Sequence, residues 1–288
     1  MTRKKMMEKI VHGVFFLLGL ITIACVLLIT IYLIISGLPA IREIGVMNFL
    51  FGKQWSPTAA TPQYGILPFI LTSIYGTFGA VLIGVPIGFL CAVYLSKMAS
   101  DSVKSCMQAA VSLLAGIPSV VYGLVGMLVL VPMIKKMFRV PDGASLLAAI
   151  IVLAIMILPS IIKMSITALD AVPKEYEDAS LALGATPVET YFRVSVPAAK
   201  SGIAAAVVLG VGRAIGEAMA VMMVAGNAAN MPDSLFQSVR FLTTAVSSEM
   251  SYSSGLQRQA LFSIALILYL FILLLNAALN YFLKKEKN

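Results

Sequence analysis

Five stretches of the chain contain no charged side chain, and this feature limits most strongly what the chain can fold into. They cover residues 10–41, 54–96, 105–134, 143–162 and 259–283. Because a helix needs roughly 20 apolar residues to cross a bilayer, each stretch is long enough to span one. The composition agrees, since 60% of the residues are hydrophobic and 12% are charged. A water-soluble core is excluded, and we expect a polytopic helical membrane protein.

A sixth apolar segment, residues 202–224, is interrupted by two charged residues, Arg213 and Glu217. With this segment included, the sequence predicts an all-α polytopic membrane protein with six transmembrane helices. No fixed-period repeat and no change of composition marks a separate soluble domain, so we expect a cytoplasmic tail over 1–10 and one transmembrane domain over 11–288. The predicted spans lie near residues 11–36, 66–95, 108–134, 144–168, 202–226 and 259–283.

Lysine and arginine are distributed unequally between the two sides of the predicted spans. The side that carries both termini holds 13 of them and the other side holds 7, while Arg213 is left inside a span. Because cytoplasmic loops are enriched in positive charge, we expect both termini in the cytoplasm. The cluster of Lys135, Lys136 and Arg139 disagrees with this topology, because it places three positive charges in one short external loop.

The residue types that carry most enzyme chemistry are scarce. The chain has one histidine, His12, and its three cysteines, Cys25, Cys91 and Cys106, lack the CxxC spacing of metal and redox sites. It also lacks the GxxxxGK(S/T) loop that binds nucleotide phosphates. The net charge of +8 is spread over the span ends and forms no single stripe, which disfavours nucleic acid as a partner. We therefore expect no enzyme activity, no metal site and no nucleotide bound by this chain.

The connection between the fourth and fifth spans, residues 171–200, is predicted to be rigid. Pro173 suits the first turn of a short helix, the acidic residues after it favour that end, and Gly184 suits the position just past the far end. Thr186 and Glu189 then have the spacing of a capping box at the start of a second short helix. Two capped helices joined by a tight turn would form a stiff projection on the cytoplasmic side.

The same loop resembles the signature of the permease subunits of ABC importers. In that signature an acidic residue, two small residues, three others and a glycine precede a branched apolar residue, an apolar residue and a proline. The matching positions are Asp178, Ala179, Ser180, Gly184, Val194, Val196 and Pro197, with Glu177 one position upstream. Asp replaces the usual Glu, and Ser replaces the second Ala. The resemblance implies that the first short helix docks in a groove of a separate ATPase, which would bind ATP and Mg, and transmits its closure to the spans.

The fifth span carries the two charges that most need an explanation. Arg213 and Glu217 are four residues apart, so in a continuous helix they can pair along one side, while Gly212 and Gly216 would let another helix approach closely. One interpretation is a self-neutralising pair with a structural role only. The other is an anion path, in which the guanidinium binds oxyanion oxygens and Glu217 orients it.

A narrower resemblance favours the anion path. The stretches RAIGEAMAV over 213–221, FLFGKQW over 49–55 and YGILP over 64–68 resemble the C-type permeases of phosphate-specific ABC importers, as do Thr243, Thr244, Glu249 and Met250. The resemblance implies a prokaryotic plasma (inner) membrane protein that moves phosphate without altering it. Its implied partners are an A-type permease in a heterodimer, two ATPase subunits and an extracytoplasmic phosphate-binding protein.

Two alternatives remain open at this point. The first is an ABC importer permease for another oxyanion, such as molybdate or sulfate. The second is a proton-coupled secondary transporter in which Glu217 carries the proton. The docking loop and the lack of a visible inverted repeat argue against the second alternative, because an ion-driven carrier has no need of an ATPase docking element.

Overall fold

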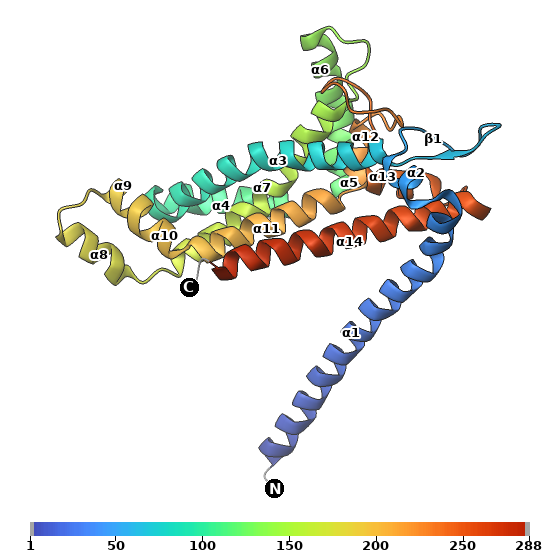
Figure 1. The fold of residues 1–288 in the computed structure, drawn as a ribbon. Helices are drawn as coiled ribbons and strands as arrows, with labels where there is room; N and C mark the ends of the chain where they lie inside the picture. The colour runs from blue at the N-terminus through green and yellow to red at the C-terminus, as the bar shows by residue number, and fades with distance from the viewer. Residues whose placement is uncertain (1–2, 286–288) are drawn as a thin grey trace.

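The computed structural model describes residues 3–285 of the chain, and most of them form long helices (Figure 1). Helix α1 begins at Arg3, within the predicted tail, and it diverges from the other helices towards its N-terminus. It meets α14 in its C-terminal half, where the hydroxyls of Thr30 and Tyr269 are 2.8 Å apart. The long helices are α1 (Arg3–Ile44), α3 (Leu67–Val93), α7 (Leu146–Asp170), α11 (Lys200–Gly216) and α14 (Gly255–Lys285).

The helical segments that can cross a membrane agree with the predicted architecture. In the described residues, five segments are long and apolar enough, namely Val11–Ile44, Leu67–Met98, Ser119–Phe138, Leu146–Asp170 and Gly255–Ala278. A sixth is obtained when α11 is joined across a 71° bend to the segment before it, Pro187–Ala198. The prediction of an all-α, polytopic membrane fold is confirmed.

The predicted third span, residues 108–134, has the wrong bounds, because the uncharged stretch belongs to two helical segments. Residues that precede a proline avoid the helical conformation, and Ile117 before Pro118 is extended, with φ −70° and ψ 127°. Helix α4 (Asp101–Gly116) therefore ends there. The next segment consists of α5 (Ser119–Val125), the π-helical turn η2 (Gly126–Leu130) and α6 (Val131–Phe138).

The predicted fifth span, residues 202–226, is also divided. Helix α11 ends at Gly216, and the short helix α12 (Met219–Val224) begins after two residues that are not helical. No proline lies at this break, and it is stabilised by the contacts of Glu217 with α12 and α13.

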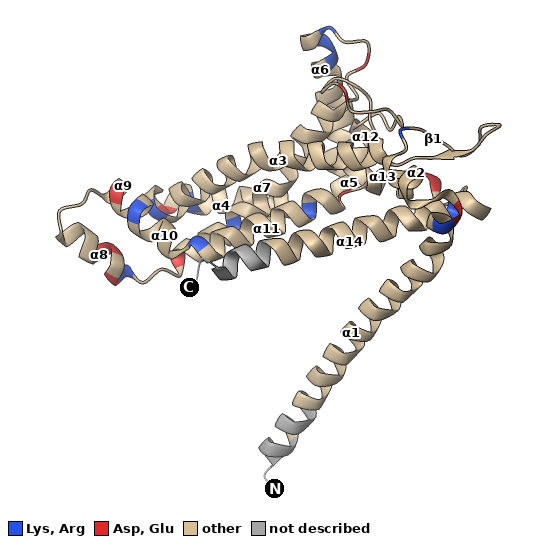
Figure 2. Cartoon of the chain, viewed as in Figure 1, with Lys and Arg blue, Asp and Glu red and all other residues tan. Residues whose placement is uncertain are grey.

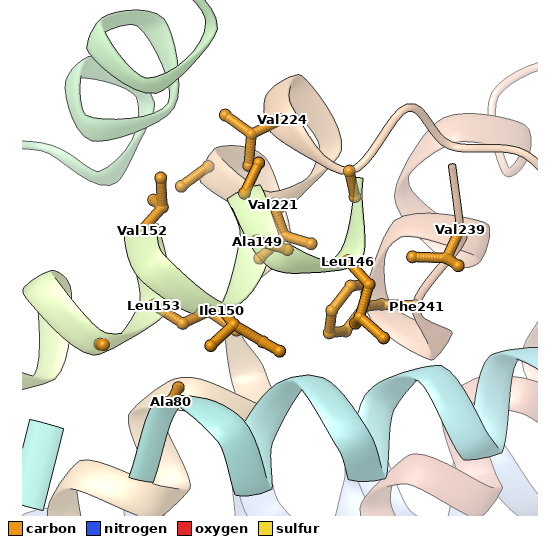
Figure 3. Packing of buried hydrophobic residues seen from close by; sticks show 14 of the residues in the cluster. Ala80, Leu146, Ala149, Ile150, Val152, Leu153, Val221, Val224, Val239 and Phe241 are labelled. Atoms are coloured by element: carbon orange, nitrogen blue, oxygen red, sulfur yellow. The ribbon is translucent and has the colours of Figure 1, made fainter. Parts of the chain in front are cut away.

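The core surrounds α7, which is buried along most of its length. Ile150 and Leu153 point towards Ala80 of α3, and Val221 and Val224 of α12 cover another side (Figure 3). The contact between α3 and α7 depends on small residues. A Cβ atom added to Gly84 would lie 3.1 Å from the backbone oxygen of Ala154 and 2.8 Å from Cγ1 of Ile157, both on α7, so a larger residue would force these neighbours to shift.

The two ends of the bundle carry different short elements (Figure 1). The end that we call the hairpin end has α2 (Val46–Phe51), α6, α13 (Leu242–Glu249) and a two-stranded antiparallel sheet, in which β1 (Trp55–Ser56) pairs with β2 (Gln63–Tyr64). The opposite end, which we call the α8 end, has η1 (Tyr94–Met98), α8 (Lys174–Ala182), α9 (Pro187–Thr190), η3 (Tyr191–Ser195) and α10 (Val196–Ala198). Charged residues gather at both ends (Figure 2).

The basic cluster of Lys135, Lys136 and Arg139 lies at the hairpin end. The ring of Phe138 packs against that of Phe236 at 4.8 Å, and the backbone N–H of Leu146 donates to Gln237 O at 3.1 Å. Both contacts join the α6–α7 connection to the segment that precedes α13. The cluster is therefore opposite α8, as a six-span topology requires.

Candidate translocation and coupling sites

Arg213 lies in the last turn of α11 and is half-buried. Its Nη1 donates a hydrogen bond to Oγ of Ser160 on α7 at 3.3 Å. A cation inside a membrane span is unfavourable unless a polar cavity or a partner compensates it. Among the described residues the partner is a neutral hydroxyl, so no carboxylate offsets the guanidinium where α7 and α11 meet.

Glu217 follows the last residue of α11 and does not pair with Arg213, which corrects the expected helical pair. Its backbone is extended, with φ −73° and ψ 130°, so the four-residue spacing no longer brings the two side chains together. Among the described side chains, no salt bridge joins them. Glu217 Oε1 instead accepts the backbone N–H of Ala220 at 3.0 Å, at the start of α12. A carboxylate is favourable at the positive end of a helix.

A hydrogen bond from α13 stabilises the break between α11 and α12. The hydroxyl of Thr243 donates to the backbone carbonyl of Glu217 at 2.7 Å, and therefore satisfies a group that the end of α11 leaves free. Thr244, the other threonine of the phosphate-permease resemblance, accepts the backbone N–H of Phe241 at 2.9 Å. A groove of about 350 Å³ opens beside the break and is lined by Gly216, Ala218, Thr243, Val246, Ser247, Ala265, Leu268, Tyr269 and Ile272.

Gly212 and Gly216 form an open face. Within 4 Å of a Cβ atom placed on either glycine, the described part of the chain has no atom outside the helix's own backbone. The close helix approach expected from their spacing is therefore not made within this chain.

A polar network at the hairpin end joins segments that are far apart in the sequence. Both carboxylate oxygens of Glu249 accept the indole N–H of Trp55, at 3.2 and 3.1 Å. The same carboxylate forms a salt bridge with Arg240 and accepts an N–H of Gln257 at 3.0 Å. Trp55 and Glu249 belong to the resemblance motifs, but their contact could not be read from the sequence because the residues are 194 positions apart.

The loop between α7 and α11 contains the two short helices that the sequence predicts. Gly184 follows α8 with φ +88°, a conformation that favours glycine, and its N–H donates to Leu181 O at 3.0 Å. The capping box at α9 is confirmed, since Thr186 N donates to Glu189 Oε2 at 3.0 Å and Thr186 Oγ1 accepts from Glu189 N at 3.4 Å. Two hydrogen bonds that Thr186 donates to the Glu189 carboxylate, from its backbone N–H foremost and from its hydroxyl at 2.9 Å, lower the pKa of Glu189.

The predicted coupling residues divide between two faces of this loop. Asp178, Ala179, Gly184 and Pro197 are exposed, and Val194 is half-buried in η3. Large apolar side chains also lie on its surface, among them Tyr176, Leu181, Leu183, Val188 and Phe192. The loop therefore presents a mixed apolar and acidic surface of the kind that a protein partner covers.

Glu177 and Ser180 face the rest of the protein. Glu177 Oε1 lies 2.6 Å from Nζ of Lys97 and accepts the hydroxyl of Ser195 at 2.8 Å, and Ser180 and Thr190 share a hydrogen bond of 2.9 Å. Burial alone would raise the pKa of Glu177, but the hydrogen bonds from Lys97 and Ser195 and nearby positive charge outweigh it, so this pKa is lowered. No motif in the sequence indicates Lys97 as a partner of Glu177.

The coupling residues and Arg213 lie at opposite ends of α11. Pro197 precedes the first residue of this helix, and Arg213 is 13 residues further along it, a rise of about 20 Å in an α-helix. One helix therefore connects the two predicted sites directly.

Comparison with known sequences identifies relatives over most of the chain. Residues 84–288 match the family described as the binding-protein-dependent transport system inner membrane component. The chain is 42% identical to the probable ABC transporter permease protein YqgH of Bacillus subtilis, over 90% of this chain and 86% of that protein. It is 33% identical to the phosphate transport system permease protein PstC of Haemophilus influenzae, over 89% of this chain and 86% of that protein. The PstC protein of Pasteurella multocida is also 33% identical, over 77% of this chain and 75% of its own length.

Solved structures share the fold. The chain superposes on a bacterial alginate ABC transporter with a TM-score of 0.68 and 14% identity, over 93% of each chain. It superposes on the MetNI methionine ABC transporter with a TM-score of 0.57 and 20% identity, over 77% of this chain and 94% of that one. These matches confirm the prediction of a fold of the type I ABC importer permeases, and the relatives confirm the resemblance to C-type phosphate permeases. The chain belongs to the family of binding-protein-dependent transport system inner membrane components.

Proposed function

We propose that this chain is a transmembrane permease subunit of an ATP-driven ABC importer for inorganic phosphate. The observation that carries the proposal is the position of Arg213, whose guanidinium lies inside a span and is hydrogen-bonded to a neutral serine. A planar guanidinium offers several N–H donors to the oxygens of phosphate and remains charged at all physiological pH values. The PstC relatives support phosphate as the anion.

The α8 end faces the cytoplasm in this proposal, and the hairpin end faces outwards. Both chain termini are then cytoplasmic, in the inner (plasma) membrane of a prokaryote. The excess of lysine and arginine on the α8 side supports this orientation.

The exposed surface of α8 would dock on a cytoplasmic ATPase. Two copies of this ATPase, which bind ATP and Mg, would serve the heterodimer of this chain with an A-type permease. The open face at Gly212 and Gly216 suits a helix of that second permease, because small residues let helices approach closely. An extracytoplasmic phosphate-binding protein would deliver the anion at the hairpin end.

The residues of this chain act by binding and by movement, because phosphate is moved unchanged. ATP-driven closure of the ATPases would displace α8, and α11 would carry the displacement to the Arg213 end. Arg213 would then bind phosphate in place of its weak hydrogen bond to Ser160. Glu217, held at the start of α12, would fix the end of α11 without neutralising the guanidinium.

Uptake by the complete complex in proteoliposomes tests the proposal. We expect uptake of radiolabelled phosphate that requires ATP and exceeds the uptake of molybdate and sulfate. Arg213→Ala should lower it by at least about 10-fold, whereas Arg258→Ala, which removes an exposed arginine at the start of α14, should not. Preference for molybdate or sulfate would contradict the choice of anion, and uptake driven by a proton gradient without ATP would contradict the importer.

A further inference from the structure

The cytoplasmic end of the second span holds the start of α8 through two consecutive residues. Helix α3 continues into the π-helical turn η1, and such turns often occur at functional sites. From η1, Ser96 Oγ donates to Oδ1 of Asp170 at 2.5 Å, and Nζ of Lys97 lies 2.6 Å from Oε1 of Glu177. Asp170 ends α7 and Glu177 lies in the first turn of α8, so these contacts bracket the connection between them.

The pair of Lys97 and Glu177 is withdrawn from water. The side chains are 11% and 17% exposed, whereas those of the neighbouring pair of Lys104 and Asp170, 3.4 Å apart, are 30% and 43% exposed. Exposed ion pairs hold their partners weakly, because water and salt screen them. Removing one partner of a shielded pair is more disruptive, because the other charge stays behind without compensation.

Helix α8 has few other attachments. None of its residues is buried, so it does not contribute an apolar side chain to the core. Its inward contacts are polar: Glu177 with Lys97 and Ser195, and Ser180 with Thr190. Ser195 and Thr190 belong to the same loop as α8. The salt bridge from Lys97 therefore links α8 to a membrane span that is remote from it in the sequence.

We propose that Lys97 is a positioning residue for energy coupling, which ties α8 to α3 so that displacement of α8 moves α3 together with α11. This inference rests on the proposed function. Asp178 and Ala179, exposed residues of the signature, would contact the ATPase. Glu177 lies beside them and faces inwards, so its salt bridge with Lys97 would pass the displacement of α8 to α3. Helix α3 packs along α7 in the core, so it would transmit the movement into the bundle.

The number of phosphate ions taken up per ATP hydrolysed tests this role in the complete complex. Complexes are purified through the ATPase subunit, so that only assembled ones are compared. Substitutions in a coupling network change coupling by about 0.5–2 kcal/mol, so Lys97→Met and Glu177→Gln should lower this ratio by about 2-fold to 30-fold. The control Lys104→Met breaks the more exposed pair and should leave the ratio unchanged. The exchanged pair, Lys97→Glu with Glu177→Lys, should restore much of it.

A fluorescent label on α3 gives a second measurement that does not depend on the transported anion. Phe78 is 66% exposed, so Phe78→Cys can be labelled in a chain whose three native cysteines are replaced by serine. We expect ATP to change the label's emission in the otherwise unaltered complex and in Lys104→Met, but not in Lys97→Met or Glu177→Gln. Glu177→Gln keeps an acceptor for Ser195, and it carries the test if Lys97→Met does not assemble.

The two measurements separate the possible failures. An unchanged uptake ratio and an unchanged label response in both variants would overturn the role of Lys97, even if phosphate is transported. The complex could also take up no phosphate and still show a label response that disappears in the variants. That result would support the role of Lys97 and contradict phosphate as the substrate. No label response in the unaltered complex would overturn the inference, because α3 would not move with ATP.

Discussion

Arg213 and Ser160 join α11 to α7 through a hydrogen bond of 3.3 Å, and this contact takes the place of the salt bridge that the sequence spacing predicts. A serine hydroxyl orients a guanidinium without neutralising it. Glu217, whose carboxylate could have neutralised it, is turned to the start of α12. The positive charge in the span is therefore available to an anion, and the two charged residues can be tested separately.

Removing Arg213 should strongly reduce transport, and removing Glu217 as well should not restore it. A hydrogen bond to a charged group is worth about 1.5–3 kcal/mol, so Arg213→Ala should lower phosphate uptake by about 10-fold to 150-fold. If Arg213 and Glu217 neutralised each other, Arg213→Ala would leave the Glu217 carboxylate without its partner, and adding Glu217→Ala would remove that defect. Here the second substitution only removes a cap of α12, so we expect uptake to stay low. Assembly with the ATPase, measured by co-purification, should persist in both variants. Recovery of uptake in the double variant would show that Arg213 has a structural role only.

The fold could be predicted wherever the signal was local. Uncharged stretches located α7 and α14 because each is one unbroken apolar run. The same signal joined α4 to α5, because hydropathy does not register the bend at Pro118. The break after Gly216 could not be predicted, since it depends on Thr243, 26 residues away, and on the side chain of Glu217 turning to α12.

The candidate sites follow the same rule. The capped helices of the loop were predictable because their caps lie within a few residues of each other. The partner of Glu177 was not, because nothing near Lys97 in the sequence indicates α8. Sequence spacing therefore indicated candidate residues, and the tertiary contacts decide which of them are exposed and which face the bundle.

A bulky residue at position 179 should uncouple the ATPase without disturbing this chain. Ala179 is exposed on α8, so Ala179→Trp meets no neighbouring core and should leave insertion in the membrane unchanged. It should block docking, and ATP-driven uptake should fall to background. Ser102→Trp, on an exposed position of α4 at the same end, is the matched control. Normal uptake with Ala179→Trp would mean that this face of α8 does not dock.

Proline at position 184 should have the same effect by a different route. Gly184 has φ +88° and donates its N–H to Leu181, whereas proline fixes φ near −65° and has no N–H. Gly184→Pro should therefore rearrange the turn between α8 and α9. We expect the full-length chain in the membrane fraction, with loss of both ATPase co-purification and uptake.

The attachment of α8 should be insensitive to pH until strongly acidic conditions. The pKa of Glu177 in the folded protein is below its usual 4.5, so the carboxylate stabilises the folded loop above that value, and this contribution is lost as the pH falls through the lowered pKa. Lys97 and Lys174 are the positive groups near this carboxylate. Hydrogen exchange of α8, corrected for intrinsic rates, should stay slow from pH 8 to 5 and accelerate only as the pH falls through the lowered pKa of Glu177. Glu177→Gln should remove this acid transition, and a transition near neutral pH would contradict the assignment.

The network around Glu249 should stabilise the hairpin end. Glu249→Gln leaves Arg240 partly buried without its counter-charge, a defect that costs about 1–3 kcal/mol. Trp55→Phe keeps the ring but removes the N–H donor, so its effect should be smaller. Thermal unfolding of the detergent-solubilised complex measures both. Asp233→Asn, which alters an exposed acid on the segment before α13, is the control, and an equal effect of all three changes would argue against the network.

The α6–α7 connection should be accessible from the same side as the hairpin. Single cysteines at Gln63, Lys136 and Leu183, all exposed positions, can be introduced into a chain without its native cysteines. A membrane-impermeant maleimide added to intact cells should label the first two and not the third, because Leu183 lies at the α8 end.

The basic cluster at 135–139 makes Lys136 the decisive position, since positive charge favours the cytoplasm. The contacts of Phe138 with Phe236 and of Leu146 with Gln237 join this connection to the segment before α13. If the cysteines at positions 136 and 183 are both labelled only after the membrane is opened, residues 119–138 do not cross the bilayer. The six-span topology would then have to be abandoned.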